Sequence, residues 1–531
     1  MSDPRVRPLG DAAVSLELGD SLDPVTNARV RALDRELARD PFDGFREAVP
    51  THRSLLVLYD PAAIRYAAVE RDLRARAAQA TTTLPPGRLH EMPAVYGGAD
   101  GPDLASLARG KELAEGDLVT LHASHDYPAF MLGFTPGFAY LGLVPEPLET
   151  PRRATPRVRV PAGSIAVAGR QTGIYPVASA GGWQLIGRTS RRLFDPFRPE
   201  PALIAPGDRV RFVPVAELPP AEDPAPGPEA TGTPAVEVRE RGLLTTVQDG
   251  GRAGHRRSGV SGAGPMDPRT HAAANRAVGN PEAAAALECT VSGPTLLVLA
   301  PVWFAVAGAD LGALLERSDL GAWEVPRGAA VLARPGNILR FAGRRSGCRA
   351  TIAFRGGIDV PAALGSRSTD LQSGFGGFAG RALAEGDRLA VGPLGPQREG
   401  REAESLPLAT AVTVRVVLGP QDGSVEPGSV ERFLSEPWRL GPTSDRVGCR
   451  LEGPALRHRG PAEILSDGMV PGSIQVPPDG SPIVMMADGP TTGGYPKIAT
   501  VVTRDLPALA QLVPGEGEVR FEAVSIEEAQ E

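Results

Sequence analysis

The sequence predicts a mainly β protein with additional α+β structure: a small α+β unit at the N-terminus, then related β-barrel units in both halves. Its 531 residues are too many for one hydrophobic core and predict roughly three or four units. Glycine (63) and proline (54) are abundant and spread along the chain, which favours short strands and tight turns over long helices. Short motifs also recur in the same order in the two halves, as repeated units would produce.

The first unit, residues 1–83, mixes strand and helix patterns. Ala13–Leu18 alternates like a strand, and Asn27–Ala38 has the spacing of an amphipathic helix. Ser54–Tyr59 is an apolar strand, and a turn then leads into a second helical pattern at Ala63–Ala77. This order predicts a small α+β domain.

Composition sets the remaining boundaries. Residues 84–213 form the expected barrel domain of the first half. The stretch 214–234 is rich in proline, alanine and glutamate and has almost no large apolar side chain, so it predicts a linker. Residues 235–531 form the second half, with a possible subdivision near 394–406.

Three motifs of the first half are similar to three motifs of the second half and occur in the same order. Each set precedes or follows a short apolar strand, which predicts homologous barrels, although two similar turns can also arise by chance. The first-half motifs are Val160–Ser164, Thr172–Pro176 and Pro206–Phe212. Their second-half counterparts are Val476–Ser481, Thr492–Pro496 and Pro514–Phe521.

Charge and hydropathy exclude two classes of partner. The net charge of −7 gives no basic footprint for nucleic acid. No apolar run reaches the roughly 18 residues of a membrane span, and no charged-then-apolar leader is present. The three cysteines are far apart, which fits a reducing cytoplasm better than a disulfide framework.

Ready-made catalytic motifs are missing from the sequence. It contains no GxxxxGK[ST] phosphate loop, no HExxH, no paired CxxC and no Gly-x-Ser-x-Gly elbow. We therefore predict no metal site and no triad hydrolase. Any ATP must be bound by another geometry or by another chain.

Glycine-rich polar clusters are the remaining candidates in the first half. Gly133–Gly142 combines glycines with aromatic residues such as Tyr140, so its main-chain N–H groups can approach a carboxylate or an oxyanion. A buried loop corner with stacked aromatics explains the same composition. His122, eleven residues before the loop, has the right chemistry for proton transfer but also fits a core histidine.

The second half has a similar cluster. Gln248, Asp249 and Arg252 surround two glycines and offer an amide, a carboxylate and a guanidinium to a small zwitterion or amide. Arg446 lies in another polar turn. Turn and capping roles explain such residues equally well, and Asp267 before Pro268 is a good helix N-cap.

Taken in order, the first-half motifs resemble the B subunit of 5-oxoprolinase, a family also described as allophanate hydrolase subunit 1 or as kinase-inhibitor-like. The second-half motifs resemble the C subunit, also described as allophanate hydrolase subunit 2. The first set is Leu121–His122, Tyr127, Met131–Leu141, Val160–Ser164, Arg170–Pro176 and Gly181–Thr189. The second set is Thr246–Arg252, Gly365–Thr369, Ser444–Arg446, Ile474–Pro477 and Thr491–Lys497.

The resemblance implies cyclophilin-like barrels in both halves and fused B and C subunits of an ATP-dependent 5-oxoprolinase. A separate A subunit would complete the enzyme, which would hydrolyse the small-molecule amide 5-oxo-L-proline to L-glutamate, with ATP bound by the assembled complex. Whether the chain forms a homo-oligomer stays open. One alternative is the carboxyltransferase component of a urea or amide carboxylase, with biotin on a partner. Another is a regulatory kinase-inhibitor-like protein.

The resemblance also implies the site residues. The expected catalytic residues are His122, which would move a proton, Gln171 and Tyr175, which would orient substrate, and Asp249. The expected substrate-binding residues are Tyr140, Arg170, Gln248, Arg252, Arg446, Gln475, Thr492 and Tyr495. Gly489-Pro490 replaces a glutamine that is usual in the C subunit, which shifts the expected catalytic contacts toward the first half.

Overall fold

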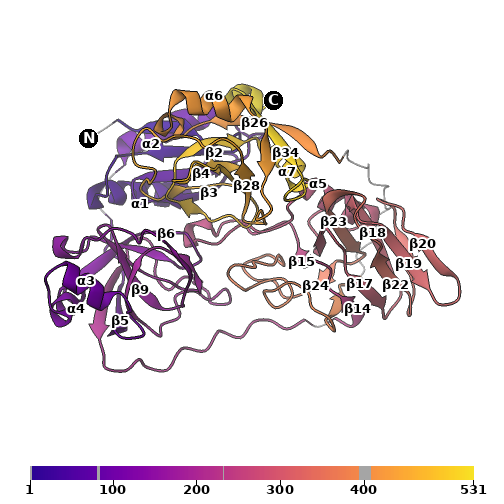
Figure 1. Ribbon diagram of the computed structural model, residues 1–531, viewed down its shortest axis with the longest axis horizontal. Coiled ribbons are helices and arrows are strands. Elements are labelled where there is room, and N and C mark those ends of the chain that lie inside the picture. Colours follow the sequence, from indigo (N-terminus) through magenta and orange to yellow (C-terminus); the bar gives the residue numbers. More distant parts are fainter. Residues whose placement is uncertain (1–2, 81–83, 231, 394–407) are drawn as a thin grey trace.

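The computed structural model describes residues 3–80, 84–230, 232–393 and 408–531 (Figure 1). Near the N-terminus, four antiparallel strands pair in the order β1-β2-β4-β3 and two helices pack against them. All four predicted elements of this region are present, with small shifts at their ends. The elements are β1 (Arg5–Pro8), β2 (Ala13–Glu17), α1 (Pro24–Arg39), β3 (Phe45–Pro50), β4 (Ser54–Tyr59) and α2 (Tyr66–Gln79).

Helix α1 begins where the sequence gives it a cap. The Asp23 carboxylate accepts a 2.7 Å hydrogen bond from the Thr26 amide, and Pro24 occupies the first turn, where no backbone donor is needed. Val30, Leu33 and Leu37 recur on one face and are fully buried against the sheet. The pattern that predicted a helix is therefore the pattern that packs it.

Both faces of this N-terminal sheet are covered. Leu55 and Val57 of β4 face the helices, whereas the intervening Leu56 faces away and shares a small apolar cluster with Val470 of the second half. A strand buried on both faces needs an unbroken apolar run, which is what Ser54–Tyr59 provides. The N-terminal unit is thus packed against the C-terminal part of the chain.

The first barrel is closed by seven strands in the order β10-β7-β6-β13-β5-β12-β9. Its first and last strands, β5 and β13, pair in parallel, while the other pairs are antiparallel. The elements are β5 (Leu89–Tyr96), α3 (Leu104–Gly110), α4 (Glu115–Ala123), β6 (Asp126–Leu132), β7 (Ala139–Gly142), β8 (Arg157–Val160), β9 (Ser164–Ala168), β10 (Gln171–Ile174), β11 (Ser179–Gly181), β12 (Gln184–Arg188) and β13 (Arg209–Pro214).

The second half begins with two sheets that share one core, which the sequence did not predict. A seven-stranded sheet has the order β20-β19-β22-β17-β14-β25-β24, and a five-stranded sheet has the order β15-β16-β23-β18-β21. The strands are β14 (Pro234–Glu240), β15 (Leu244–Gln248), β16 (Ala286–Thr290), β17 (Thr295–Val298), β18 (Val302–Asp310), β19 (Ala313–Arg317), β20 (Gly321–Glu324), β21 (Val331–Ala333), β22 (Ile338–Phe341), β23 (Ser346–Phe354), β24 (Ile358–Asp359) and β25 (Arg388–Val391).

Helix α5 (Pro268–Ala277) lies beside these sheets, and its start settles one alternative. The Asp267 carboxylate accepts a hydrogen bond from the Thr270 amide at 3.0 Å, so Asp267 is the N-cap of α5.

The second barrel repeats the first strand for strand. Its order, β26-β33-β30-β31-β28-β27-β34, is the first barrel's order with each strand replaced by its counterpart, including a parallel pair of first and last strands. Barrels in both halves are therefore confirmed. The elements are β26 (Ala411–Leu418), α6 (Pro427–Ser435), β27 (Trp438–Leu440), β28 (Gly448–Glu452), β29 (Asp467–Gly468), β30 (Ser473–Gln475), β31 (Ile483–Met485), β32 (Thr492–Gly493), β33 (Lys497–Val501), α7 (Leu506–Ala510), β34 (Glu518–Ala523) and α8 (Ile526–Ala529).

The strand order also corrects two of the three motif matches. The motif Val160–Ser164 enters β9, whose counterpart is β30, but Val476–Ser481 precedes β31. Likewise Thr172–Pro176 belongs to β10, whereas Thr492–Pro496 leads into β33, the counterpart of β12. Only the third match, at the last strand of each barrel, joins equivalent positions. The repeat is real, but those two alignments were wrong.

The expected linker crosses the molecule as an extended segment (Figure 1). Among its described residues, 215–230 and 232–233, there is no helix or strand, and Ala225 donates to Asp195 of the first half at 2.7 Å. The subdivision predicted near 394–406 lies outside the described residues. Within the described ranges, no helix is both long and apolar enough to cross a membrane.

Candidate functional site

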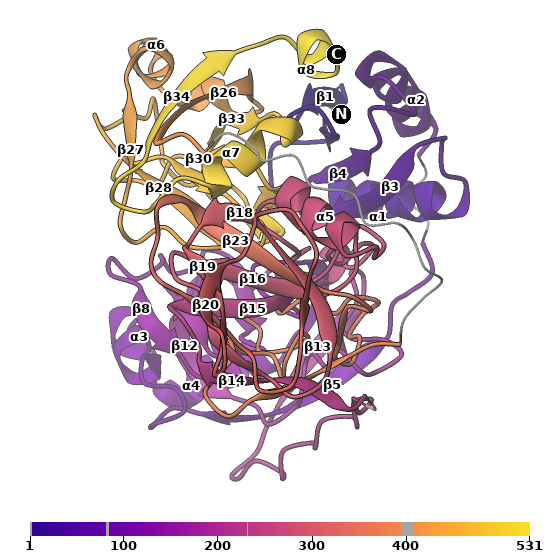
Figure 2. The ribbon, with the colours of Figure 1, turned by 90° about the vertical axis from the view of Figure 1, so that its right-hand side faces the viewer.

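The two barrels meet the N-terminal unit at one junction, which contains a cavity of about 470 Å³. Figure 2 shows the N-terminal unit and the second barrel side by side, with the first barrel beneath them. Arg152, Arg170, Gln171 and Trp183 line the cavity from the first half, and Glu463–Ser466 lines it from the second half. Both halves of the chain are therefore needed to form this cavity.

The two arginines of the cavity differ in their partners. Arg152 approaches Glu463 across the junction at 3.7 Å. Arg170 is exposed, and no carboxylate of the described residues lies within ion-pair distance of it. Its guanidinium is free to bind a planar anion such as a carboxylate.

An aromatic cluster lies behind the cavity. Tyr140 is 6% exposed, and its ring lies 4.9 Å from Phe138 and 5.9 Å from Trp183, in edge contacts typical of packed aromatics. Burial raises the pKa of Tyr140, although hydrogen bonding to Ser466 and Thr492 of the second half acts in the opposite direction. The hydroxyl of Tyr140 is therefore neutral and joins the two halves.

The glycine-rich loop before Tyr140 contacts the second barrel. The Phe134 amide donates to Thr492 Oγ1 at 3.0 Å. A Cβ atom at Gly133 would stand 2.0 Å from that oxygen, so only glycine fits there. At this position the glycine serves the contact between barrels, and the amide after it is already used.

A buried ion pair lies next to Ser466. Lys497 Nζ is 3.2 Å from Asp467 Oδ2, and neither side chain is more than 3% exposed. Ser54 of the N-terminal sheet also donates to Asp467, as does the Gly468 amide at 2.9 Å. Burial alone would raise the pKa of Asp467, but Lys497 and Ser54 outweigh it and lower that pKa, so the carboxylate stays charged.

His52 connects this region to the cavity wall. Its Nε2 atom lies 3.4 Å from the Gln171 side-chain nitrogen, which can only donate. The imidazole proton is therefore on Nδ1, which has no partner among the described residues. Burial lowers the pKa of His52 to about 3, so the ring is neutral and holds Gln171 by accepting its hydrogen bond.

Several predicted residues lie at this junction. Arg170 and Gln171 line the cavity, and Tyr140 and Thr492 join the barrels beside it. Gln475 donates to the Tyr495 carbonyl oxygen at 3.3 Å and so belongs to the same side of the second barrel. Tyr175 does not line the cavity. It is 2% exposed within the aromatic cluster, and burial raises its pKa.

His122 lies elsewhere, in the core of the first barrel. Its Nδ1 atom is 2.8 Å from the Tyr96 hydroxyl, its Nε2 atom is 2.9 Å from Thr172 Oγ1, and Phe212 packs 4.6 Å from its ring. Burial lowers its pKa to about 3. This is the environment of the core histidine that the sequence left as an alternative, and it has no contact with the cavity.

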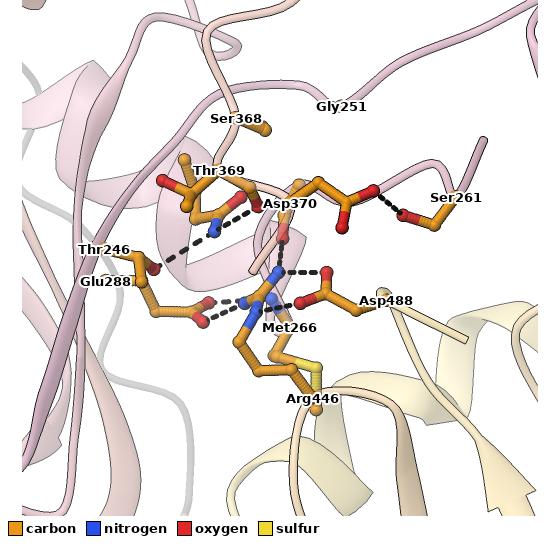
Figure 3. A network of polar contacts seen from close by, with 12 residues as sticks. Thr246, Gly251, Ser261, Met266, Glu288, Ser368, Thr369, Asp370, Arg446 and Asp488 are labelled. Atoms are coloured by element: carbon orange, nitrogen blue, oxygen red, sulfur yellow. Dashed lines mark hydrogen bonds and ion pairs between the residues drawn. The ribbon is translucent and has the colours of Figure 1, made fainter. Parts of the chain in front are cut away.

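Arg446 is also bound within the protein (Figure 3). It forms two 2.8 Å hydrogen bonds with Asp488 and a further ion pair with Glu288, at the boundary between the two sheets and the second barrel. Burial lowers the pKa of Arg446, but the two carboxylates outweigh that effect and raise it. Because Arg446 is already paired with two carboxylates, it has no free charge with which to bind a substrate anion. The structure therefore does not support that expected role.

The remaining predicted residues hold a neighbouring loop. The Asp249 carboxylate accepts from the Ser366 hydroxyl at 2.5 Å and the Ser368 hydroxyl at 2.6 Å. Arg252 donates to the Ser368 carbonyl oxygen and packs over Phe375. These contacts correspond to the turn alternative for this cluster.

Two polar atoms of the cluster remain without a partner among the described residues. They are Gln248 Oε1 and Arg252 Nη1.

Sequence reasoning missed His52, Asp467 and the role of Lys497. One signal was available for Lys497, because only two lysines occur in a chain whose Lys+Arg total is 56. His52 and Asp467 carry no such signal. Among the described residues, no group of three or more His, Cys, Asp or Glu side chains is placed to hold a metal ion.

Comparisons with known proteins agree with this two-part organisation. The family described as carboxyltransferase domain, subdomain C and D, matches residues 4–204, and the one described as carboxyltransferase domain, subdomain A and B, matches residues 258–523. The N-terminal half is 47% identical to the B subunit of 5-oxoprolinase from Escherichia coli O157:H7 over 210 residues, which cover 39% of this chain and 95% of that protein.

The C-terminal half is 40% identical to the C subunit of 5-oxoprolinase from Escherichia coli K12 over 296 residues, which cover 55% of this chain and 93% of that protein. The crystal structure of TTHA0988 is similar over 96% of this chain and 99% of that one, with a TM-score of 0.85 and 38% identity. The chain therefore belongs to the carboxyltransferase-domain family, joining a half similar to the B subunit of 5-oxoprolinase to a half similar to its C subunit.

Proposed function

We propose that this chain is the fused B and C component of an ATP-dependent 5-oxoprolinase, which works in the cytoplasm with a separate A subunit to open 5-oxo-L-proline to L-glutamate. The observation that carries this proposal is the junction cavity, because it is lined by the first half and the second half of the chain together. A cavity formed in this way gives a reason for the two halves to act as one unit.

The cavity offers groups that match the two ends of the substrate. Arg170 carries a charge without a carboxylate partner among the described residues, so it suits the substrate carboxylate. Gln171, held by His52, has an amide that can pair with the lactam N–H and carbonyl. Trp183 covers the cavity wall and suits the apolar face of the five-membered ring.

The lactam resists hydrolysis because its amide is resonance-stabilised and ring opening is uphill. ATP, bound in the assembled complex, supplies the activation of the amide oxygen. The residues of this chain hold the ring in place and exclude water until the A subunit is engaged. The buried Lys497–Asp467 pair fixes the wall segment that contains Ser466.

The test is reconstitution. The purified chain is mixed with ATP, 5-oxoproline and a candidate A subunit, and glutamate is measured. Arg170→Gln should raise KM for 5-oxoproline about tenfold or more, since a hydrogen bond to a charged group contributes about 1.5–3 kcal/mol. Arg209→Gln, which removes an exposed arginine on β13 away from the cavity, is the control and should leave KM unchanged. No glutamate with a competent A subunit would refute the proposal.

A second candidate is carboxyl transfer to urea or a related small amide, with biotin on a partner protein. The carboxyltransferase description of the matching family favours it. The same purified chain is therefore also incubated with a biotin carboxylase, a biotinylated carrier, ATP, bicarbonate and urea. Carboxylation there, without glutamate formation in the first assay, would replace the first proposal by the second.

A further inference from the structure

A second cavity, of about 490 Å³, lies on another side of the junction. It is bounded by α1, by the loop 199–206 of the first barrel and by residues 257–258 of the second half, and it shares no lining residue with the junction cavity. Four arginines line it, against two carboxylates. These are Arg31, Arg35, Arg88 and Arg257, with Asp34 and Glu200.

Two of the four arginines are already paired. Arg257 binds Asp34, which joins the second half to the N-terminal unit. Arg88 is 2.7 Å from Glu200 and 3.4 Å from Asp208. The charge of these two arginines is therefore compensated inside the protein.

The other two arginines, Arg31 and Arg35, have no carboxylate within ion-pair distance among the described residues. They stand four residues apart on α1, so they lie on one face of the helix, where like charges repel. Burial lowers the pKa of Arg31, and the charge of Arg35 lowers it further. The cavity therefore holds an excess of positive charge that a bound anion would neutralise.

Arg31 is held in position. Its Nε atom donates to Asn27 Oδ1 at 3.0 Å, and Asn27 in turn donates to the Phe130 carbonyl oxygen of the first barrel at 3.1 Å. A Cβ atom at Gly207 would stand 2.2 Å from Arg31 Nη1, so glycine is what lets this guanidinium lie against the loop. A cationic group fixed in this way loses little conformational entropy when it binds an anion.

We propose that this cavity binds a phosphate group, with Arg31 and Arg35 as its ligands and the Arg257–Asp34 ion pair at its edge. Guanidinium groups bind phosphate oxygens in pairs of parallel hydrogen bonds, and a dianion would neutralise both unpaired charges. Because Arg257 and Ser258 of the second half line the cavity, its wall is complete only when both halves are joined. The ligand is either free phosphate or the phosphate chain of a nucleotide.

Binding is measured by titration calorimetry on the whole chain, with no other protein present, so the result does not depend on the proposed function. The ligands are inorganic phosphate, ATP and, as a monovalent carboxylate, acetate. Arg31→Gln and Arg35→Gln should each weaken binding about tenfold, the equivalent of about 1.4 kcal/mol. Arg39→Gln is the matched control, since Arg39 is exposed at the end of the same helix and does not line the cavity.

The outcomes separate the two sources. If phosphate and ATP both bind and both weaken in the two variants, the site accepts free phosphate. If only ATP binds and weakens, the site takes a nucleotide. The proposal is wrong if neither ligand binds, if acetate binds as tightly as phosphate, or if Arg31→Gln and Arg35→Gln bind like the unsubstituted chain while their melting temperatures are unchanged.

Discussion

The burial of His122 predicts how strongly the stability of the first barrel depends on pH. Burial lowers the pKa of its imidazole from 6.5 to about 3, so the folded protein does not protonate it at pH 5. The unfolded chain does bind that proton below pH 6.5. The free energy of unfolding is therefore unaffected by this group above pH 6.5, and it falls as the pH is lowered from 6.5 toward 3.

The loss is worth about 1.4 kcal/mol for each pH unit below 6.5, which gives about 2 kcal/mol at pH 5. His122→Gln should remove that dependence, because glutamine is neutral at both pH values and can still hydrogen-bond to Tyr96 and Thr172. His125→Gln is the comparison variant. His125 is exposed three residues later, and its charge is the smaller of the two causes that lower the pKa of His122, so most of the dependence should remain.

The assay is amide hydrogen exchange of the strands around His122, which reports the free energy of opening the first barrel at pH 7 and pH 5. The opening free energy of the unsubstituted chain should fall by about 2 kcal/mol more than that of His122→Gln. Equal falls in both proteins would refute the reasoning. If His122→Gln instead abolishes glutamate formation without changing the opening free energy, the histidine acts in catalysis.

Three further predictions concern contacts between units. Arg446→Met leaves Glu288 and Asp488 buried without a counter-charge and should cost about 3–5 kcal/mol, seen as a lower melting temperature; an unchanged temperature would contradict it. In the reconstitution assay of the proposed function, Gly133→Ala should reduce glutamate formation while far-UV circular dichroism is unchanged. Adding Thr492→Gly should restore part of that activity, because the clash is with the Thr492 side chain. Proteolytic cleavage within 215–230 should leave the halves co-eluting on size exclusion, and separation would show that the interface depends on the linker.

From the sequence, the presence of both barrels was predicted correctly, but two of the motifs were matched between strands that are not equivalent. Both barrels are present, since each local pattern of glycine, proline and apolar strand belongs to one turn and its flanking strands. Two motif matches nonetheless joined the wrong strands. Short motifs in which Val-Pro is soon followed by Gly-Ser can occur at several turns of one barrel, and only hydrogen-bonded strand order identifies equivalent ones.

The residues that line the junction cavity were predicted in part for a similar reason. Arg170 and Gln171 lie within one recognisable motif and do line the cavity. His52 and Asp467 become part of the region only because three units pack together, and no local pattern marks either residue. The ion pairs of Arg446 could not be predicted, because a polar turn does not reveal that two buried carboxylates, one from a distant strand, will lie against it.

The packing of the N-terminal sheet against the second barrel has a consequence for synthesis. Ser54 and Asp467 are separated by 413 residues, so at ribosomal rates about 20–80 s pass before the sheet meets its partner. During that time Leu56 and its apolar neighbours face water. Two separate chains would have to find each other by diffusion, at a rate set by their concentrations. In this chain the partner surface is always part of the same molecule. Burial of this face of the sheet is therefore independent of expression level.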